Sequence, residues 1–391
     1  MALINTGVAL CPVGAEKTVS NELRKMDFSI EESGYGRVRF KTGLEGLYRS
    51  LIGLRSADRL LLEAGSFDAP DFDALFEGVR RIPWEELIPP NTGLKVDKVR
   101  TNRSKLMAET GIQAVVHKAA AQKLCSKRGI KRLPDDKIGA ELRVYIEKDR
   151  ASILLDISGK PLFRRGYRTQ GGPAPLRETT AAAIILLSGW KRKFPLYDPF
   201  CGSGTIAIEA ALYAWDIAPG LLRSFALEQM PFSDKEMENR IREEFLSRVD
   251  FSRKVRISGS DSDATIVEAA RSNLKRSLYG LHSGEDLLSF EVIPIGEANP
   301  GSSDAGFIIT NPPYGRRLGD SESAERTYKE MGNFREKFPG WKLAVITDHA
   351  GFESFFGSKA DSCREITNGA VQTYLFQYES LKELYVHSRG A

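Results

Sequence analysis

The sequence predicts an α/β protein in which a doubly wound, largely parallel sheet follows an α+β module. From about residue 165 onward, short apolar runs alternate with helical patterns, as expected of a parallel sheet that helices cover on both faces. Before that point, short strands follow one another or are separated by single helices, which favours antiparallel pairing. With 391 residues, the chain is long enough for two or three domains, each with its own core.

The first 160 residues are expected to contain short strands and amphipathic helices. Residues 6–12 form a β-like apolar run, and the stretch after them spaces Val19, Leu23 and Met26 as a helix does. The further elements that we expect are a strand at 36–40, a helix and then a strand within 43–67, a helix over 71–88 that ends near Pro83, a strand at 94–101, a helix over 104–129 and a strand pair within 141–159.

The alternation of strands and helices is regular in the remainder of the chain. The expected strands lie at 194–200, 254–261, 290–297, 305–313, 341–348 and 370–379, and the expected helices lie within 171–190, 205–214, 264–278 and 324–338. In doubly wound sheets, ligands bind beyond the carboxyl ends of the strands. Polar residues that directly follow these strands are therefore the candidate site residues.

Composition predicts a soluble, cytosolic protein without a metal site. Hydrophobic residues make up 41% of the chain and charged residues 28%, a globular balance, and no apolar run approaches the length of a membrane span. The N-terminus lacks the basic opening segment of a secretory signal. The four cysteines are widely scattered, and no two of them have the spacing of metal ligands or of a redox pair.

Positive charge is concentrated in one segment, although the net charge of the whole chain is only +4. Between residues 95 and 132 there are two acidic residues and the following basic ones: Lys95, Lys98, Arg100, Arg103, Lys105, Lys118, Lys123, Lys127, Arg128, Lys131 and Arg132. Such a local excess attracts a phosphate backbone. A solvated helix face would produce the same pattern, so the segment alone leaves both interpretations open.

A glycine-containing loop follows the strand at 194–200. Gly202 and Gly204 allow positive φ and close backbone approach, and a helix that begins near Thr205 directs free N–H groups toward an anion. Asp198 at the strand end adds a carboxylate for a polar or cationic group. The lysine that closes a phosphate-binding loop is missing, as is the dinucleotide pattern G-x-G-x-x-G. A ligand with one carboxylate and one cation, such as S-adenosylmethionine, fits this loop better.

Acidic residues also follow the next two strands. Asp261 and Asp263 lie where a carboxylate would hold a ribose diol, although Asp263 is equally placed to cap the following helix. Glu297 follows the third strand, where it could accept a hydrogen bond from an adenine amino group. Together with the glycine loop, these acids predict a nucleoside-binding edge.

The strand at 305–310 ends in Asn311-Pro312-Pro313-Tyr314. The two prolines stiffen the loop, and the carbonyl of Pro312 has no neighbouring N–H to compete for it. An amino group on a conjugated ring becomes nucleophilic only as its nitrogen turns tetrahedral. Two acceptors, the Asn311 side-chain oxygen and the Pro312 carbonyl, would favour that change, while Tyr314 stacks on the ring. No metal or strong base is required.

The motifs "DPFCGSGT" and "NPPYG" resemble those of S-adenosylmethionine-dependent methyltransferases that act on exocyclic or amide nitrogens. The stretches "LRSADRLLLEAGSF", "VRRIPWEELI", "LLDISGKPLFRRGYR" and "APLRETTAAAIILLSGW" are similar to those of bacterial THUMP-containing guanine-N2 methyltransferases of large-subunit (23S) ribosomal RNA, including the N-terminal half of the fused two-methyltransferase enzymes. The resemblance implies a ferredoxin-like segment at 1–55, a THUMP RNA-binding domain at 56–160 and a Rossmann-like methyltransferase domain at 161–391.

The same resemblance implies roles for individual residues. The methyl-donor site would comprise Asp198, Cys201, Gly202, Ser203, Gly204, Thr205, Asp261 and Glu297, with Pro175, Leu176 and Glu178 from an upstream segment that closes over the methionine end of the cofactor. Glu297 departs from the aspartate of the family pattern. The target base would meet Asn311, Pro312, Pro313 and Tyr314. The basic segment would fall inside the THUMP domain, so that all of its basic residues except Lys123 are expected to contact RNA.

The expected function is methyl transfer to the N2 amine of a guanine in large-subunit ribosomal RNA, either as naked RNA or within a precursor particle. A transfer-RNA guanine-N2 enzyme or a nucleic-acid adenine-N6 enzyme would keep the same catalytic motifs, and a non-catalytic RNA-binding assembly factor would keep the N-terminal module. The basic segment 164–170, "RRGYRTQ", has two open interpretations: a linker contact to RNA or a solvated strand.

Overall fold

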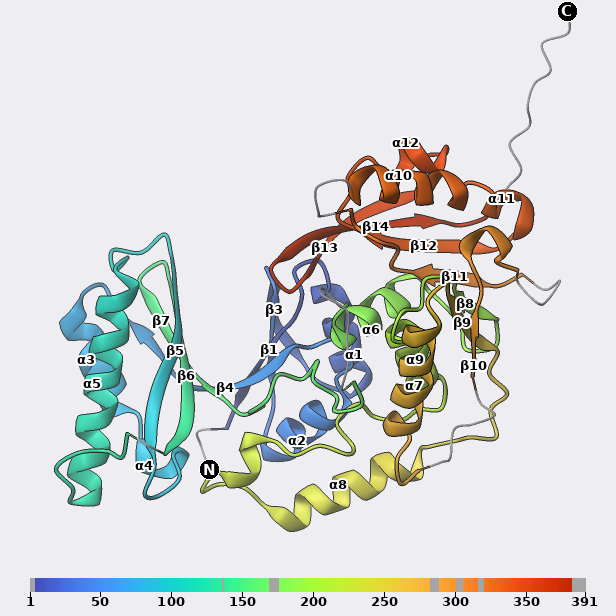
Figure 1. Ribbon diagram of the computed structural model, residues 1–391. Helices are drawn as coiled ribbons and strands as arrows, with labels where there is room; N and C mark the ends of the chain where they lie inside the picture. The colour runs from blue at the N-terminus through green and yellow to red at the C-terminus, as the bar shows by residue number, and fades with distance from the viewer. Residues whose placement is uncertain are drawn as a thin grey trace, which may run out of the picture.

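Two seven-stranded sheets form the framework of the chain (Figure 1). The structure is a computed structural model that describes residues 4–135, 137–168, 176–281, 288–299, 305–315 and 320–381. One sheet belongs to the N-terminal 160 residues, and the other belongs to the remainder of the chain. This division confirms the predicted α/β fold, with an α+β module before a doubly wound sheet.

The first sheet has the strand order β2-β3-β1-β4-β7-β6-β5. The strands are β1 (Thr6–Leu10), β2 (Ile30–Gly34), β3 (Arg37–Lys41), β4 (Arg59–Asp68), β5 (Gly93–Asn102), β6 (Ile138–Glu147) and β7 (Arg150–Asp156). Neighbouring strands are antiparallel except for β5 and β6, which are parallel. A parallel pair needs a long crossover, and the helix between these two strands supplies it.

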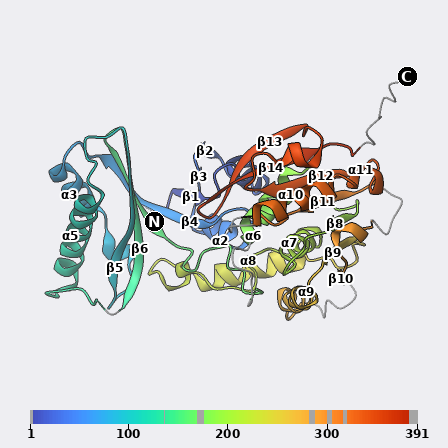
Figure 2. The same cartoon turned by 45° about the horizontal axis from the view of Figure 1, so that its top comes forward.

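Strand β4 joins the two halves of this sheet. Its first residues, Arg59 to Leu62, pair with β1, while Leu61 to Asp68 pair with β7. The ferredoxin-like part, built on β1 to β3, and the part built on β5 to β7 therefore share a continuous hydrogen-bonded ladder. Figure 2 shows β4 running from one part to the other.

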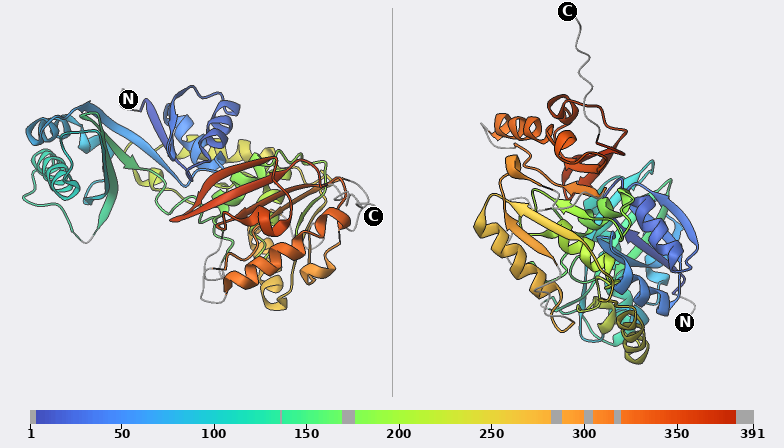
Figure 3. Two further views of the ribbon diagram at one scale, coloured as in Figure 1. Left: turned by 90° about the horizontal axis from the view of Figure 1, so that it is seen from above. Right: turned by 90° about the vertical axis from the view of Figure 1, so that its right-hand side faces the viewer.

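Helices flank each half of the first sheet. The helices are α1 (Glu16–Lys25), α2 (Leu44–Gly53), α3 (Phe72–Arg81), α4 (Trp84–Leu87) and α5 (Glu109–Arg128). The helix expected to end near Pro83 is α3, which ends at Arg81, and a second short helix, α4, follows Pro83. The unit of α3, α4 and α5 stands at one end of the molecule, away from the second sheet (Figure 3).

The second sheet has the order β10-β9-β8-β11-β12-β14-β13. Its strands are β8 (Leu196–Asp198), β9 (Ile257–Asp261), β10 (Ser289–Val292), β11 (Phe307–Thr310), β12 (Lys342–Thr347), β13 (Ser362–Asn368) and β14 (Val371–Tyr378). The strands from β10 to β12 are mutually parallel, and β14 and β13 add an antiparallel edge. The order reverses at β8, so the carboxyl ends of β8, β9 and β11 meet at the point where such sheets bind ligands.

The helices of this half are α6 (Glu178–Leu187), α7 (Thr205–Ala214), α8 (Lys235–Ser247), α9 (Ala264–Ser277), α10 (Asp320–Met331), α11 (Phe334–Lys337) and α12 (Phe352–Phe356). Helices α7 and α9 lie side by side next to β8 and β9, and α10 lies next to α12 (Figures 1 and 2). The glycine loop leads directly into α7, as the sequence predicts.

Helix α8 is one of four α-helices and β-strands that were not expected from the sequence, the others being β2, α12 and β13. Asp234 caps its N-terminus by accepting a hydrogen bond from the Met237 N–H at 2.9 Å. The helix packs on α2 of the ferredoxin-like part, where Arg49 forms a two-pronged ion pair with Glu244 at 2.9 and 2.6 Å. The capping aspartate was a signal available in the sequence, but the surface that α8 covers was not.

The edge strand β13 docks on a loop of the ferredoxin-like part. The Thr367 N–H donates to the Val13 carbonyl at 3.0 Å, and the Val13 N–H donates to the Thr367 hydroxyl at 2.9 Å. Gly14 follows with φ of +93°, and a Cβ added there would lie 2.1 Å from the Glu365 carbonyl oxygen. The two sheets thus approach each other so closely that only glycine fits. Within the described ranges, no helix is long and apolar enough to cross a membrane.

Substituting Gly14 by alanine should destabilise the protein, because the methyl group meets backbone atoms and the residue keeps a positive φ. We expect a loss of ~2–3 kcal/mol in the free energy of unfolding. Chemical denaturation of Gly14→Ala beside Gly43→Ala, where an added Cβ meets no atom within 4 Å, measures the difference. Equal stability of the two variants would contradict this account of the contact.

Candidate active site

Asp198 lies at the carboxyl end of β8, the central strand of the parallel part. Its carboxylate is 1% exposed and accepts hydrogen bonds from the Thr310 hydroxyl at 2.6 Å and from the Phe200 N–H at 3.2 Å. Burial raises the pKa of Asp198 to about 7, which these two hydrogen bonds oppose and the nearby Asp261 charge reinforces. The bond from Thr310 joins the end of β8 to the end of β11.

The loop between β8 and α7 has the conformation that its glycines predict. Gly202 and Gly204 have φ values of +50° and +84°. A Cβ on Gly204 would come within 3.0 Å of Ala270 and Phe290, whereas Gly202 faces open space. The Asn273 amide donates to the Ser203 carbonyl at 2.9 Å and fixes the loop against α9. The first N–H groups of α7, which have no partner within the helix, lie directly behind this loop.

Asp261 at the end of β9 is half-exposed beside this loop. Its two oxygens accept one hydrogen bond each, from the Gly202 N–H at 3.0 Å and from the Asp263 N–H at 3.1 Å. Asp263 caps α9 by accepting from the Thr265 N–H at 2.8 Å. Asp263 therefore caps the helix, and the role of Asp261 at a ribose stays a prediction, which its position beside the loop allows.

Glu297 belongs to a short 3-10 turn, Ile295–Glu297, after β10, and its side chain is exposed. The Ile293 N–H, just before the turn, donates to the Asp261 carbonyl at 3.0 Å. The ends of β9 and β10 are thus adjacent, and the three acids expected at the nucleoside-binding edge lie on neighbouring strand ends.

The Asn311 to Tyr314 segment directly follows β11. The Tyr314 hydroxyl donates to the Asn311 side-chain oxygen at 2.5 Å, and Pro312 is buried. Tyr328 was not among the expected site residues; it is a fully buried residue of α10 whose hydroxyl donates to the Pro313 carbonyl at 2.8 Å and contacts the Thr347 hydroxyl at 3.0 Å. Tyr328 looks like one more apolar-face residue of a helix, so nothing in the local sequence separates it from core packing.

The described residues 176–178 of the upstream segment are linked to the end of the glycine loop through Arg168, which contacts both Glu178 and Thr205. Leu176 and Glu178 are buried, and Pro175 lies outside the described residues. Glu178 opens α6 and pairs with Arg168 at 2.8 Å. Burial raises the pKa of Glu178 to about 7 despite the opposing Arg168 charge.

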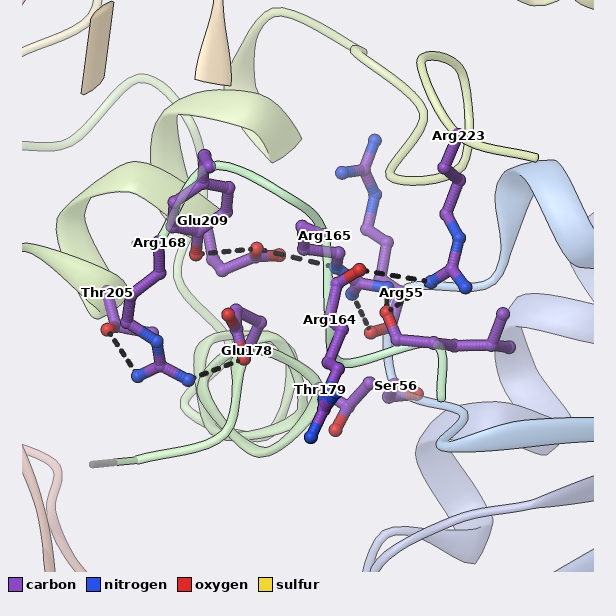
Figure 4. Close-up of polar contacts among 12 residues, drawn as sticks. Arg55, Ser56, Arg164, Arg165, Arg168, Glu178, Thr179, Thr205, Glu209 and Arg223 are labelled. Atoms are coloured by element: carbon purple, nitrogen blue, oxygen red, sulfur yellow. Dashed lines mark hydrogen bonds and ion pairs between the residues drawn. The ribbon is translucent and has the colours of Figure 1, made fainter. Parts of the chain in front are cut away.

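In the basic segment before α6, Arg164 is exposed but Arg165 and Arg168 point inward, which neither of the two interpretations anticipated (Figure 4). The Arg165 side chain is 3% exposed and pairs with Glu209 at 3.5 Å, and Tyr167, which is 4% exposed, donates its hydroxyl to Glu209 at 3.0 Å. Arg168 also contacts the Thr205 hydroxyl at 3.5 Å. These side chains are neither solvated nor free for RNA, because carboxylates and backbone carbonyls accept most of their donors, the buried Arg165 Nε excepted. Thr169 and Gln170 lie outside the described residues.

The residues expected to contact RNA lie on β5, on α5 and on the segments next to them. Lys95, Lys98, Arg100, Arg103, Lys105, Lys118, Lys127, Lys131 and Arg132 are exposed. Arg128 differs, because its guanidinium donates to the carbonyls of Thr92, Ile88 and Pro89 at 2.9 to 3.0 Å. These bonds hold the end of α5 against the turn at 88–92.

A cavity of about 780 Å³ opens between β5 and α5, with Lys95, Lys118, Lys131 and Arg132 among its lining residues.

The donor set fits S-adenosylmethionine. The half-exposed carboxylate of Asp261 suits a ribose diol, the open backbone at Gly202 admits close approach, and the helix start at Thr205 suits a carboxylate. Among the described residues, no cluster of three or more His, Cys, Asp or Glu side chains could hold a metal ion. The fold and this site define an S-adenosylmethionine-dependent methyltransferase.

Comparison with known families places the chain more narrowly. Residues 165–377 match the model of the RMKL-like methyltransferase domain, residues 6–61 that of the RlmL ferredoxin-like domain and residues 69–156 that of the THUMP domain. The chain therefore belongs to the family of RMKL-like methyltransferases that carry ferredoxin-like and THUMP domains, which confirms the resemblance noted in the sequence.

Individual relatives agree with this assignment. YpsC of Bacillus subtilis (strain 168), named as a candidate RNA methyltransferase, is 36% identical over 377 residues, covering 96% of each chain. The ribosomal RNA large subunit methyltransferase K/L of Methylococcus capsulatus is 35% identical over 398 residues and 98% of this chain, which spans only about half (52%) of that protein. The crystal structure of SMU.472 with SAH superposes with a TM-score of 0.84 at 37% identity, over 97% of this chain and 99% of that one.

Replacing Asp198 by asparagine should stabilise the ligand-free protein at alkaline pH. Because the folded-state pKa of Asp198 is about 7 and its ordinary value is 3.8, the native state holds the proton more tightly, and wild-type stability falls as the pH rises from about 4 to about 7. Asparagine cannot ionise. The difference in unfolding free energy should therefore grow across that window to the order of 4 kcal/mol at pH 8.

Denaturant titrations of the wild type and Asp198→Asn at pH 5 and pH 8 measure this difference, with the exposed Asp73→Asn as a control for loss of charge. A gain in stability that is the same at both pH values would show that burial of the Asp198 charge is not its cause.

Proposed function

We propose that this protein transfers a methyl group from S-adenosylmethionine to the exocyclic N2 amine of a guanine in large-subunit ribosomal RNA. The observation that carries the proposal is the 2.6 Å hydrogen bond from Thr310 to Asp198. It holds the Asn311 to Tyr314 segment, which suits an amino group on a flat ring, next to the loop that suits the methyl donor.

In this proposal the donor site comprises Leu176, Glu178, Asp198, the loop from Cys201 to Thr205, Asp261 and Glu297. Bound S-adenosylmethionine supplies an electrophilic methyl group on its sulfonium. The main-chain N–H groups of the loop and the start of α7 bind its polar groups, and Asp261 accepts hydrogen bonds from its ribose.

At the acceptor side, the Asn311 side-chain oxygen and the Pro312 carbonyl accept hydrogen bonds from the two N–H groups of the guanine amine. These bonds favour the tetrahedral nitrogen, whose lone pair then takes the methyl group while a proton leaves the nitrogen for solvent. Tyr328 and Pro313 hold the loop in place. Tyr314 already bonds to the Asn311 oxygen, which orients the amide and leaves its second lone pair for the substrate. Stacking by Tyr314 requires the base to be brought out of its helix.

The choice of ribosomal RNA rests on the names of the relatives and on the THUMP match. We assign the ferredoxin-like segment to residues 1–55, the THUMP domain to 56–160 and the methyltransferase domain to 161–391, while the match to the ferredoxin-like model extends to residue 61. The exposed basic residues of β5, α5 and their flanking segments would bind phosphates, and Arg128 would support them by holding the turn at 88–92.

Substituting Asn311 by alanine should lower the rate of methyl transfer by about a hundredfold or more, the effect of losing one preorganised polar group at a reacting centre. RNA affinity should stay within about twofold, because phosphates supply most of it. The test uses purified protein with unmodified large-subunit RNA and labelled methyl donor, and Asn333→Ala, an exposed asparagine, serves as the control.

Cells that lack the protein should lose one N2-methylguanosine from large-subunit RNA in nucleoside mass spectrometry, and Asn311→Ala should not restore it. Loss of the mark from transfer RNA, or loss of N6-methyladenosine, would contradict the proposed substrate. An unchanged nucleoside profile would favour a non-catalytic assembly factor.

Replacing Lys118 and Lys131 together by glutamine should weaken RNA binding and flatten its salt dependence. Both side chains are exposed, and neither has an acidic partner among the described residues. Each phosphate contact contributes about 0.7–0.9 to the slope of log affinity against log salt, so the slope should fall by about 1.5. Lys25→Gln with Lys254→Gln, two exposed lysines outside the basic segment, is the matched control, and an equal effect of both pairs would argue against the assigned surface.

A further inference from the structure

Arg168 contacts both walls of the donor site. Its guanidinium donates to the Leu176 carbonyl at 2.9 Å and to the Glu178 carboxylate at 2.8 Å, and it approaches the Thr205 hydroxyl at 3.5 Å. Leu176 and Glu178 lie at the start of α6, and Thr205 opens α7 behind the glycine loop. Figure 4 shows the guanidinium between the two helix starts. One side chain thus fixes the spacing of the two segments that are expected to enclose the cofactor.

Two other residues of the linker Arg165–Arg168 contact α7 one turn further along the helix. Glu209, fully buried on α7, accepts from the Tyr167 hydroxyl at 3.0 Å and pairs with Arg165. The Tyr167 carbonyl accepts from Arg276 of α9 at 2.8 Å. Arg276 also donates to Asn273, the residue that supports the glycine loop, at 2.7 Å. The linker is therefore part of the scaffold of the loop rather than a tether beside it.

The linker is in turn anchored to the ferredoxin-like part. The Arg165 guanidinium donates to the carbonyls of Arg55 and Leu162. Asp58 accepts from the Arg177 guanidinium at 3.0 Å and from the Thr179 hydroxyl at the start of α6. Arg55 and Asp58 both lie within the range that matches the ferredoxin-like model. The start of α6 is thus held directly by Asp58, and α7 is linked to the ferredoxin-like part through Arg165, which contacts both Glu209 and the Arg55 carbonyl.

We propose that Arg168 is a positioning residue for the methyl donor, and that the linker Arg165–Arg168 makes the donor pocket depend on the ferredoxin-like part of the same chain. The inference rests on the proposed location of the donor site. It predicts that cofactor affinity is set partly by residues that touch neither cofactor nor RNA.

Arginine suits this role because its planar guanidinium offers five N–H donors in fixed directions and so can bind three groups at once. Lysine carries its donors on one nitrogen and cannot span a carbonyl, a carboxylate and a hydroxyl in the same way. Without Arg168, burial and the charge of Glu209 would still raise the pKa of Glu178, and only Arg165 would remain as a cation to lower it. Glu178 would then take up a proton at higher pH.

The test compares Arg168→Gln and Arg168→Lys with Arg164→Gln, a neighbouring linker arginine whose side chain is exposed. Isothermal titration with S-adenosylmethionine should show about tenfold or greater weakening for Arg168→Gln, as expected for the loss of hydrogen bonds to a charged group, and smaller weakening for Arg168→Lys. Arg164→Gln should match the wild type. RNA affinity, measured separately, should stay within about twofold for all three variants.

A second readout separates positioning from a general loss of stability. As the pH is lowered, the cofactor affinity of Arg168→Gln should begin to fall at a higher pH than the cofactor affinity of the wild type does. The reason is that Glu178 takes up its proton at a higher pH when Arg168 is absent. Adding Glu178→Gln to each protein should remove that difference.

If Arg168→Gln does not fold, Arg168→Lys carries the same comparison. Cofactor affinity of the folded variant within about twofold of the wild type, or a pH profile that does not move, would overturn the proposal. Unchanged cofactor affinity combined with lost methyl transfer in Asn311→Ala would leave the proposed function intact and reject only the role of Arg168.

Discussion

The hydrogen bond between Thr310 and Asp198 is the contact on which the candidate site depends. A carboxylate at the end of the central strand is costly to bury, and its raised pKa expresses that cost. The hydroxyl from β11 offsets part of the cost and, in doing so, fixes the relative height of two strand ends. The loop after β8 and the Asn311 segment after β11 are the two halves of the site, so a single buried pair determines their separation. The strand order, with β8 between β9 and β11, makes that contact geometrically available.

A second constraint concerns how the N-terminal module and the methyltransferase domain are joined. Besides a continuous apolar core, the contact region contains the ion pairs Arg165–Glu209 and Arg177–Asp58, with Arg55 nearby. Buried ion pairs often add little net stability, because desolvation offsets their attraction. They do penalise any arrangement that leaves one partner unpaired, and therefore favour one relative orientation of the parts. For an enzyme that must present a base from a large RNA to a small pocket, orientation is the property that matters.

Much of the site could be predicted from the sequence because its residues follow buried strands in order. In a doubly wound sheet those ends converge, so Asp198, Asp261 and Asn311 needed no long-range information beyond the alternation of strands and helices. Tyr328 and the linker arginines could not be found in this way. Tyr328 is indistinguishable from a core residue of α10, and Arg165 and Arg168 have the composition of an exposed basic run. Their roles depend on which buried oxygen each donor meets, and that is decided by packing between segments far apart in the chain.

The shared strand β4 connects these observations to the RNA. Because β4 pairs with β1 at one end and with β7 along its length, the unit that carries α5 is an extension of the ferredoxin-like sheet and not a separate body on a flexible tether. The ferredoxin-like part is fastened to the methyltransferase domain by β13 at the Val13 loop and by α8 on α2. Phosphates bound to the exposed basic residues of β5, α5 and their flanking segments would therefore be held at a set distance and angle from the Asn311 segment. Under the proposed function, such a frame would recognise the shape of a folded RNA and would bring one nucleotide over the pocket.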